Sequence, residues 1–170
     1  PNLHLICGAA GPLGMANLPF SKKMKLLRHL RMLDADYVLH DLGAGMNYHI
    51  IDFFLTADHS IVVISPNHLS IIDSYNFLKQ AFFLKLMMKF RLDGQVVDMI
   101  KQAAVAETYQ TQTSVDVLIE QIHKKSPKLA DEFKEELASF HPRLLINNYS
   151  GSNDEANCLA VKVAAKELLS

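Results

Sequence analysis

The sequence of residues 36–66, DYVLHDLGAGMNYHIIDFFLTADHSIVVISP, is the feature that most limits what this chain can fold into. It reads as an apolar strand, an acidic residue, two glycines around an alanine, a helix and a second apolar strand. Strands that are continuous apolar runs are typical of parallel sheets with both faces covered. Strands that alternate with helices predict an α/β fold with right-handed crossovers.

The same patterns extend over most of the chain. Apolar runs predict buried parallel strands at residues 3–7, 37–40, 60–65 and 143–146. Helical spacing predicts helices at residues 22–32, 48–55, 69–90, 95–104, 114–124, 127–140 and 153–169. Ser114 and Ser126 are predicted N-caps, and Pro127 suits a first helical position. We therefore expect one partial domain over residues 1–170, a mostly parallel sheet flanked by helices, with a helical insertion at residues 91–141.

Composition excludes several classes of protein. The chain of 170 residues is 49% hydrophobic with a formal net charge of -1, which gives no general electrostatic case for nucleic acid or an anionic membrane. Cys7 and Cys158 lack CxxC spacing, so we expect a reduced, cytoplasmic protein with Cys7 in the core. No apolar run reaches the length of a membrane-spanning helix. The chain starts without methionine and directly in a predicted strand, which predicts a fragment.

The loop after the second predicted strand contains candidate residues for binding Mg²⁺ and phosphate. Asp41 is expected at the carboxyl end of that strand, where open α/β sheets bind ligands. Its carboxylate can hold Mg²⁺ through water or position an attacking water. Gly43 and Gly45 let backbone N–H groups approach a phosphate, and the next helix points its positive N-terminal end at the same place. Taken alone, the motif is explained equally well by a simple strand-to-helix turn.

The wider context resembles one family. The sequence from residue 37 to residue 79 resembles the MinD/ParA-like P-loop ATPases, and within them the MinD-like subgroup that includes flagellar-number regulators. The shared features are an apolar strand, Asp-x-Gly-Ala-Gly, a helix ending in Ala-Asp, a strand ending in proline, and Ser-Ile-x-Asp opening a long helix. A second block, HPRLLINNYSGSNDEA, resembles the family's later strand that ends in asparagine.

The resemblance implies a P-loop NTPase-like fold and a set of site residues. Asp41 would be the catalytic acidic sensor and the Mg²⁺ residue, acting through water. Asn147 would read the adenine base of ATP, because an amide offers a donor and an acceptor together. Ser70 and Asp73 would begin a helix near the family's dimer face. The implied nucleotide-binding residues are Gly43, Ala44, Gly45, Pro66 and Asn147.

The chain departs from the family at its front end. It has no Gly-Lys pair and nothing similar to GxxxxGK[ST], so the phosphate cradle and its lysines are missing. We therefore expect ATP hydrolysis only in an intact parent protein and not in this chain alone. Because the missing strands are central, we expect the predicted strand at residues 37–40 to have an open edge. That edge predicts self-association, a rearranged sheet or a cover formed by the insertion.

The leading hypothesis is a fragment of an ATP-binding positioning switch, of the kind used in chromosome partitioning, cell division or control of flagellar number. The competing hypothesis is a non-catalytic protein-interaction module that works through the insertion and the helix at residues 77–90. That helix is very apolar and basic, so it could instead contact a membrane surface or pack inside. The basic residues 21–31 could contact DNA or form a solvated face. The eight histidines are not paired as HxxxH or HxH, so we expect no metal besides Mg²⁺.

Overall fold

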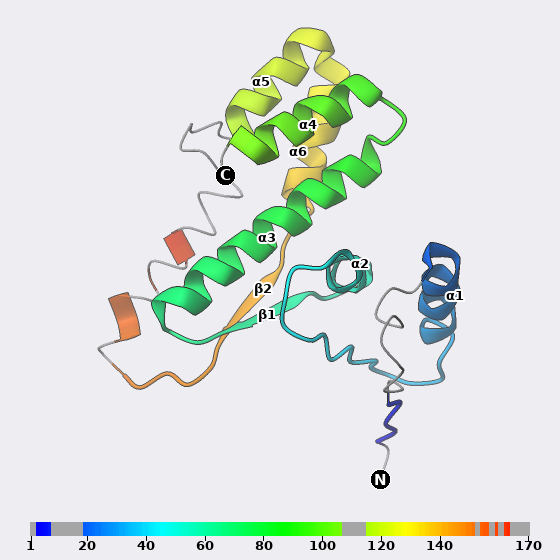
Figure 1. The fold of residues 1–170 in the computed structure, drawn as a ribbon, viewed down its shortest axis with the longest axis vertical. Coiled ribbons are helices and arrows are strands. Elements are labelled where there is room, and N and C mark those ends of the chain that lie inside the picture. The colour runs from blue at the N-terminus through cyan, green and yellow to red at the C-terminus, as the bar shows by residue number, and fades with distance from the viewer. Residues whose placement is uncertain are drawn as a thin grey trace.

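The structure, a computed structural model, describes residues 3–7, 19–106, 115–151, 154–156, 159 and 162–163. The elements in chain order are α1 (Phe20–Leu30), α2 (Tyr48–Thr56), β1 (Ile61–Ile64), α3 (His68–Lys89), α4 (Gly94–Ala106), α5 (Val115–Lys125), α6 (Pro127–Ala138) and β2 (Arg143–Ile146). The fold is mixed α/β and mostly helical, with a small two-stranded sheet (Figure 1). This confirms the coarse prediction of an α/β protein. Within the described ranges, no helix is long and apolar enough to cross a membrane.

The two strands pair in parallel, as predicted for residues 60–65 and 143–146. Ile61 lies opposite Arg143 and Ile64 opposite Ile146, and the connection between the strands runs through α3 to α6. Ile64 is buried and Val62 packs on the core, so one face of the sheet is covered. The other face is exposed in the described part of the chain. The prediction that both faces are covered is therefore wrong there.

Two predicted strands do not form. Residues 3–7 and 37–40 have no regular secondary structure, and most of their apolar side chains are exposed. Cys7 is exposed as well, so its prediction as a core residue is wrong. A strand forms only where a neighbour accepts and donates its backbone hydrogen bonds. An apolar run indicates a preference for a strand but does not determine that neighbour, and neither segment pairs with a strand among the residues that the structure describes.

The predicted helices are confirmed where the structure describes them. Ser126 caps α6 by accepting a hydrogen bond from the Leu129 N–H at 3.4 Å, and Pro127 occupies the first turn. Ser114, the other predicted cap, lies outside the described residues, as does most of the predicted helix at residues 153–169. The described residues 154–156, 159 and 162–163 of that helix are helical.

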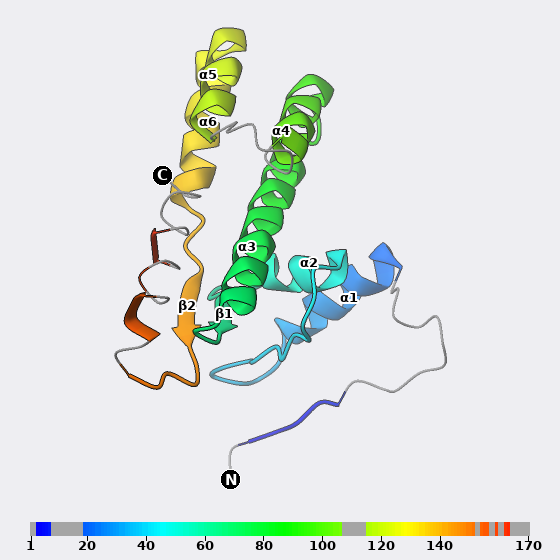
Figure 2. The ribbon, with the colours of Figure 1, turned by 60° about the vertical axis from the view of Figure 1, so that its left-hand side comes forward.

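The main core lies between helices and not on the sheet. α3 packs against α2, α4, α6 and β1, and both views show α4, α5 and α6 gathered around its second half (Figures 1 and 2). Phe82 is fully buried, and its ring centroid lies 5.5 Å from that of Phe140 and 6.4 Å from that of Phe133. The apolar side chains of residues 77–90 are thus largely used inside, which confirms the interpretation of that segment as a packing helix.

Candidate functional site

The Asp41 loop runs over the surface. Asp41 is exposed and does not end a strand, because residues 37–40 form none. Gly45 has a φ of +123°, and a residue with a Cβ would be strained in this conformation. The turn therefore requires glycine at this position. A Cβ at Gly43 would meet nothing within 4 Å, and Ala44 is exposed. Only one of the two glycines has a structural requirement here.

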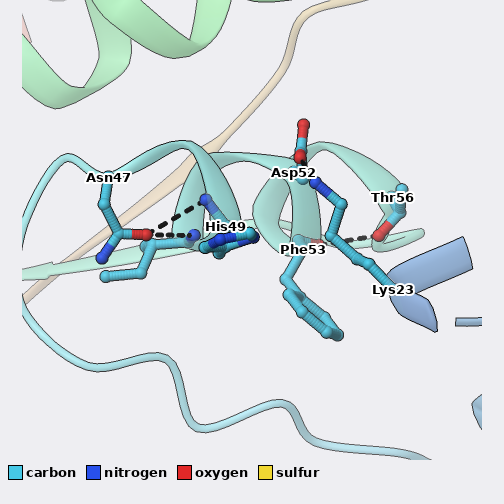
Figure 3. A network of polar contacts seen from close by, with 7 residues as sticks. Lys23, Asn47, His49, Asp52, Phe53 and Thr56 are labelled. Carbon is cyan, nitrogen blue, oxygen red and sulfur yellow. Dashed lines mark hydrogen bonds and ion pairs between the residues drawn. The ribbon is translucent and has the colours of Figure 1, made fainter. Parts of the chain in front are cut away.

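The N-terminal end of α2 is already capped. The Asn47 Oδ1 accepts hydrogen bonds from the N–H groups of His49 and Ile50, each at 3.0 Å (Figure 3). These are two of the N–H groups that a phosphate at this helix end would need. The cap was not identified from the sequence, although an asparagine directly before a helical run is the usual signal.

Another predicted set of residues meets at the carboxyl edge of the sheet. Pro66 follows β1 closely, and Asn147 follows β2 and donates its backbone N–H to the Ile64 carbonyl at 2.8 Å. The Asn147 side chain is exposed, and its Oδ1 accepts the Asn148 N–H at 3.0 Å. Within the described ranges, no residue accepts a hydrogen bond from the side-chain amide N–H₂ of Asn147. The Asn147 side chain thus lies directly after β2 at the sheet edge, as predicted from the sequence, and its amide N–H₂ has no acceptor among the described residues.

The start of α3 closes the same edge. The Asn67 side chain accepts the Ser70 N–H at 2.9 Å, and the Ser70 hydroxyl accepts the Ser65 N–H at 3.0 Å. Ser70 therefore ties the end of β1 to the first turn of α3. This local contact explains the serine at position 70 without a role in a dimer interface. Asp73 is exposed on the surface of α3.

The predicted site residues do not form a complete Mg-ATP site. In the part of the chain that the structure describes, no hydrogen bond or ion pair joins the Asp41 loop to Asn147. No three His, Cys, Asp or Glu side chains among the described residues could hold a metal ion together. Asp41 could supply one oxygen ligand, where Mg²⁺ needs six ligands from several groups. No protein-family model, no curated protein and no solved structure matches this chain.

A cavity of about 370 Å³ lies at the opposite, amino edge of the sheet. Its walls are the loops at residues 57–60 and 139–143 together with Lys85 of α3. Helices α2 and α6 both end at this cavity, so their C-terminal carbonyls give it a negative partial charge. Lys85 donates to the Ser139 hydroxyl, and to the Glu136 carbonyl at 3.3 Å. Two polar side chains of the cavity wall, Lys85 and Ser139, are therefore hydrogen-bonded to each other.

A cluster of three charges joins α3 to α6 beside this cavity. Glu136 accepts from the Lys85 Nζ at 3.1 Å and from the Lys89 Nζ at 3.0 Å. Burial raises the pKa of Glu136, but the hydrogen bonds and charges of the two lysines outweigh it and leave that pKa lowered. The hydrogen bond to Glu136 and its charge raise the pKa of Lys89. The cluster has a structural role, since it holds the two helices together.

Another ion pair joins α1 to α2. The Lys23 Nζ donates to the Asp52 Oδ2, and both side chains are largely buried, at 7% and 17% exposure (Figure 3). The Arg31 Nη2 donates to the Thr56 carbonyl at 3.1 Å. Sequence analysis missed both contacts because their partners lie 29 and 25 residues apart.

Proposed function

We propose that this chain is part of a MinD/ParA-like nucleotide-binding protein that acts as a positioning or partitioning switch. The observation that carries the proposal is Asn147, an exposed amide directly after a parallel strand and hydrogen-bonded through its backbone to the end of β1. The carboxyl edge of a parallel sheet is where α/β folds bind their ligands. The proposed ligand is ATP, whose adenine needs a donor and an acceptor.

The chemistry of the edge supports a base and not a phosphate at Asn147. Its Oδ1 uses one of two lone pairs on Asn148, which leaves a lone pair and both amide hydrogens for a purine edge. Pro66, Asn67 and Ser70 at this edge are uncharged. In the proposal, Asp41 and the glycine turn contribute the γ-phosphate and Mg²⁺ side in the intact protein, and this chain alone does not hydrolyse ATP.

The open edge of β1 supports a larger sheet in the intact protein. Ser60 and Ile64 accept hydrogen bonds from β2, so alternation turns the N–H and C=O groups of Ile61 and Val63 away from β2. In the part of the chain that the structure describes, these groups have no partner. An unpaired edge is a template for a further strand. We propose that added strands complete a P-loop NTPase-like sheet here and that the protein self-associates as the family does.

Calorimetric titration of Mg-ATP tests the proposal. We expect no binding below about millimolar ATP for the 170-residue chain, and binding for the full product of its gene. In the full product, Asn147→Ala should weaken ATP about tenfold, the value of one or two hydrogen bonds, and reduce the preference for ATP over GTP. Lys101→Ala on the surface of α4 is the matched control. Equal affinities for the wild type and Asn147→Ala would refute the adenine assignment.

A second candidate function, the interaction module without nucleotide, has its own observation. Ile61, Val63 and Leu145 form an apolar stripe on the uncovered face of the sheet, with exposed fractions of 50%, 59% and 55%. Exposed apolar side chains that gather on one face can mark a contact with another protein. A full gene product that binds no ATP but forms a stable complex through this face would favour the module.

A further inference from the structure

The cations of the chain are unevenly distributed. Five of its 17 Lys and Arg residues lie between residues 20 and 31, and that stretch contains no Asp or Glu. Helix α1 turns by about 100° per residue, so residues three and four apart share a face. Its buried residues, Lys23 and Leu27, lie on one face. Four exposed basic side chains cover the other side: Lys22, Lys25, Arg28 and His29.

Contacts with α2 fix which way this cationic face points. Lys23 pairs with Asp52 (Figure 3), and Arg31 donates to the Thr56 carbonyl. Leu27, on the same face of α1 as Lys23, is buried. In both views α1 lies beyond α2, on the side away from α4, α5 and α6 (Figures 1 and 2). The face is therefore held outward at one end of the molecule by contacts that use none of its own cations.

Exposed apolar side chains lie on α1 and in the segment that follows it. Met24 and Leu26 on α1 are 42% and 39% exposed, and Met32 and Tyr37 in the following segment are 74% and 89% exposed. A solvated helix face needs no such side chains, and their exposure to water is unfavourable. Cations next to exposed apolar groups match the interface of an anionic bilayer, which offers both counter-charge and an apolar phase.

We propose that α1 and the segment to Tyr37 form a peripheral contact surface for an anionic lipid bilayer. The cations meet the lipid headgroups while Met32 and Tyr37 enter the boundary of the acyl region. Duplex nucleic acid would satisfy the cations but offers no apolar phase for these two side chains. Asp34 and Asp36 lie in the same segment and oppose the attraction. The proposal is independent of nucleotide binding, and it concerns a helix lying on the bilayer, not one that spans it.

Co-sedimentation with vesicles tests the charge part of the proposal. We expect the chain to bind phosphatidylcholine vesicles that contain about 30% phosphatidylserine, and to leave pure phosphatidylcholine vesicles unbound. The triple variant Lys22→Glu, Lys25→Glu, Arg28→Glu should lose about 100-fold or more in affinity, since each of the three cations near an anionic surface contributes about fivefold. The matched control reverses the same number of charges on α4, α5 and α6: Lys101→Glu, Lys124→Glu and Lys128→Glu. It should stay within about threefold of the wild type.

A second pair of variants tests the choice of partner. Met32→Ser with Tyr37→Ser should weaken vesicle binding about tenfold and leave the helical circular dichroism unchanged, because both side chains are exposed. Asp34→Asn with Asp36→Asn should strengthen it. Absence of binding to the anionic vesicles, or equal losses in the control triple, would overturn the proposal. Tighter binding to duplex DNA than to vesicles would also overturn it, if the variant Met32→Ser with Tyr37→Ser left the DNA binding unchanged.

Discussion

Replacement of Asp52 by asparagine is the most informative perturbation of this structure. The change keeps the size of the side chain but removes the negative charge that Lys23 contacts. The Lys23 side chain is only 7% exposed, so its ammonium group would remain buried without this counter-charge. Removal of one partner of a buried ion pair costs about 3–5 kcal/mol. Because Asp52 is 17% exposed and partly hydrated, we expect the lower end of that range, about 3 kcal/mol.

The loss should appear locally and not as global unfolding. α1 is joined to α2 by the ion pair and by the hydrogen bond from Arg31, whereas the large core lies mainly in α3 to α6. Undocking of α1 therefore costs less than unfolding of the core. Hydrogen exchange followed by mass spectrometry should show α1 amides losing up to about 100-fold in protection, which corresponds to about 3 kcal/mol. The amides of α3 to α6 should keep their protection.

The control for this experiment removes both charges. Lys23→Met with Asp52→Leu replaces the buried pair by apolar groups of similar volume, a change that is often neutral or stabilising. We expect the double variant to recover most of the protection of α1. Unchanged exchange in Asp52→Asn, or equal losses in α1 and in α3 to α6, would show that the ion pair does not hold α1 in place.

Three further changes test the core, the charge cluster and the glycine turn by urea unfolding. Phe82→Ala should cost about 3–5 kcal/mol, since the ring is fully buried; a loss below 1 kcal/mol would contradict the helical core. Because the pKa of Glu136 is lowered in the folded protein, the ionised carboxylate stabilises the fold at pH values above 4.5, its ordinary pKa. This stabilisation disappears as the pH falls through the lowered pKa. Glu136→Gln should remove that part of the acid sensitivity, whereas Glu135→Gln should not. Gly45→Ala should cost about 1–2 kcal/mol because of its positive φ, with Gly43→Ala near neutral.

The helices could be predicted from the sequence because their information is local. Periodic apolar residues and a capping residue lie within one segment, so α6 begins at Pro127, as predicted from Ser126. A strand depends on a neighbour that lies elsewhere in the chain. β1 and β2 pair although the helical insertion separates them in sequence, while residues 37–40, which are equally apolar, pair with no strand in the described part of the chain. Apolar composition indicates a strand's preference and not its partner.

The residues of the candidate site also differ in how well their positions could be predicted from the sequence. The position of Asn147 could be predicted because it follows directly from the end of β2 and the parallel register. The position of Asp41 depended on a strand that does not form. The ion pair of Lys23 with Asp52 left no local pattern in the sequence, because charges that meet across about 30 residues resemble ordinary surface charges. Long-range polar contacts therefore had to come from the structure.

Helix α3 connects the sheet edge near Asn147 with the helical core. Its first turn belongs to the sheet edge near Asn147, through Asn67 and Ser70, and its last turns belong to the helical core through Phe82 and Lys85. Its 22 residues span about 33 Å as one rigid rod. A ligand that moved the first turn would therefore also move the packing surface for α4 and α6. If the proposed nucleotide binds at this edge, α3 is the element through which its presence would reach the helical core.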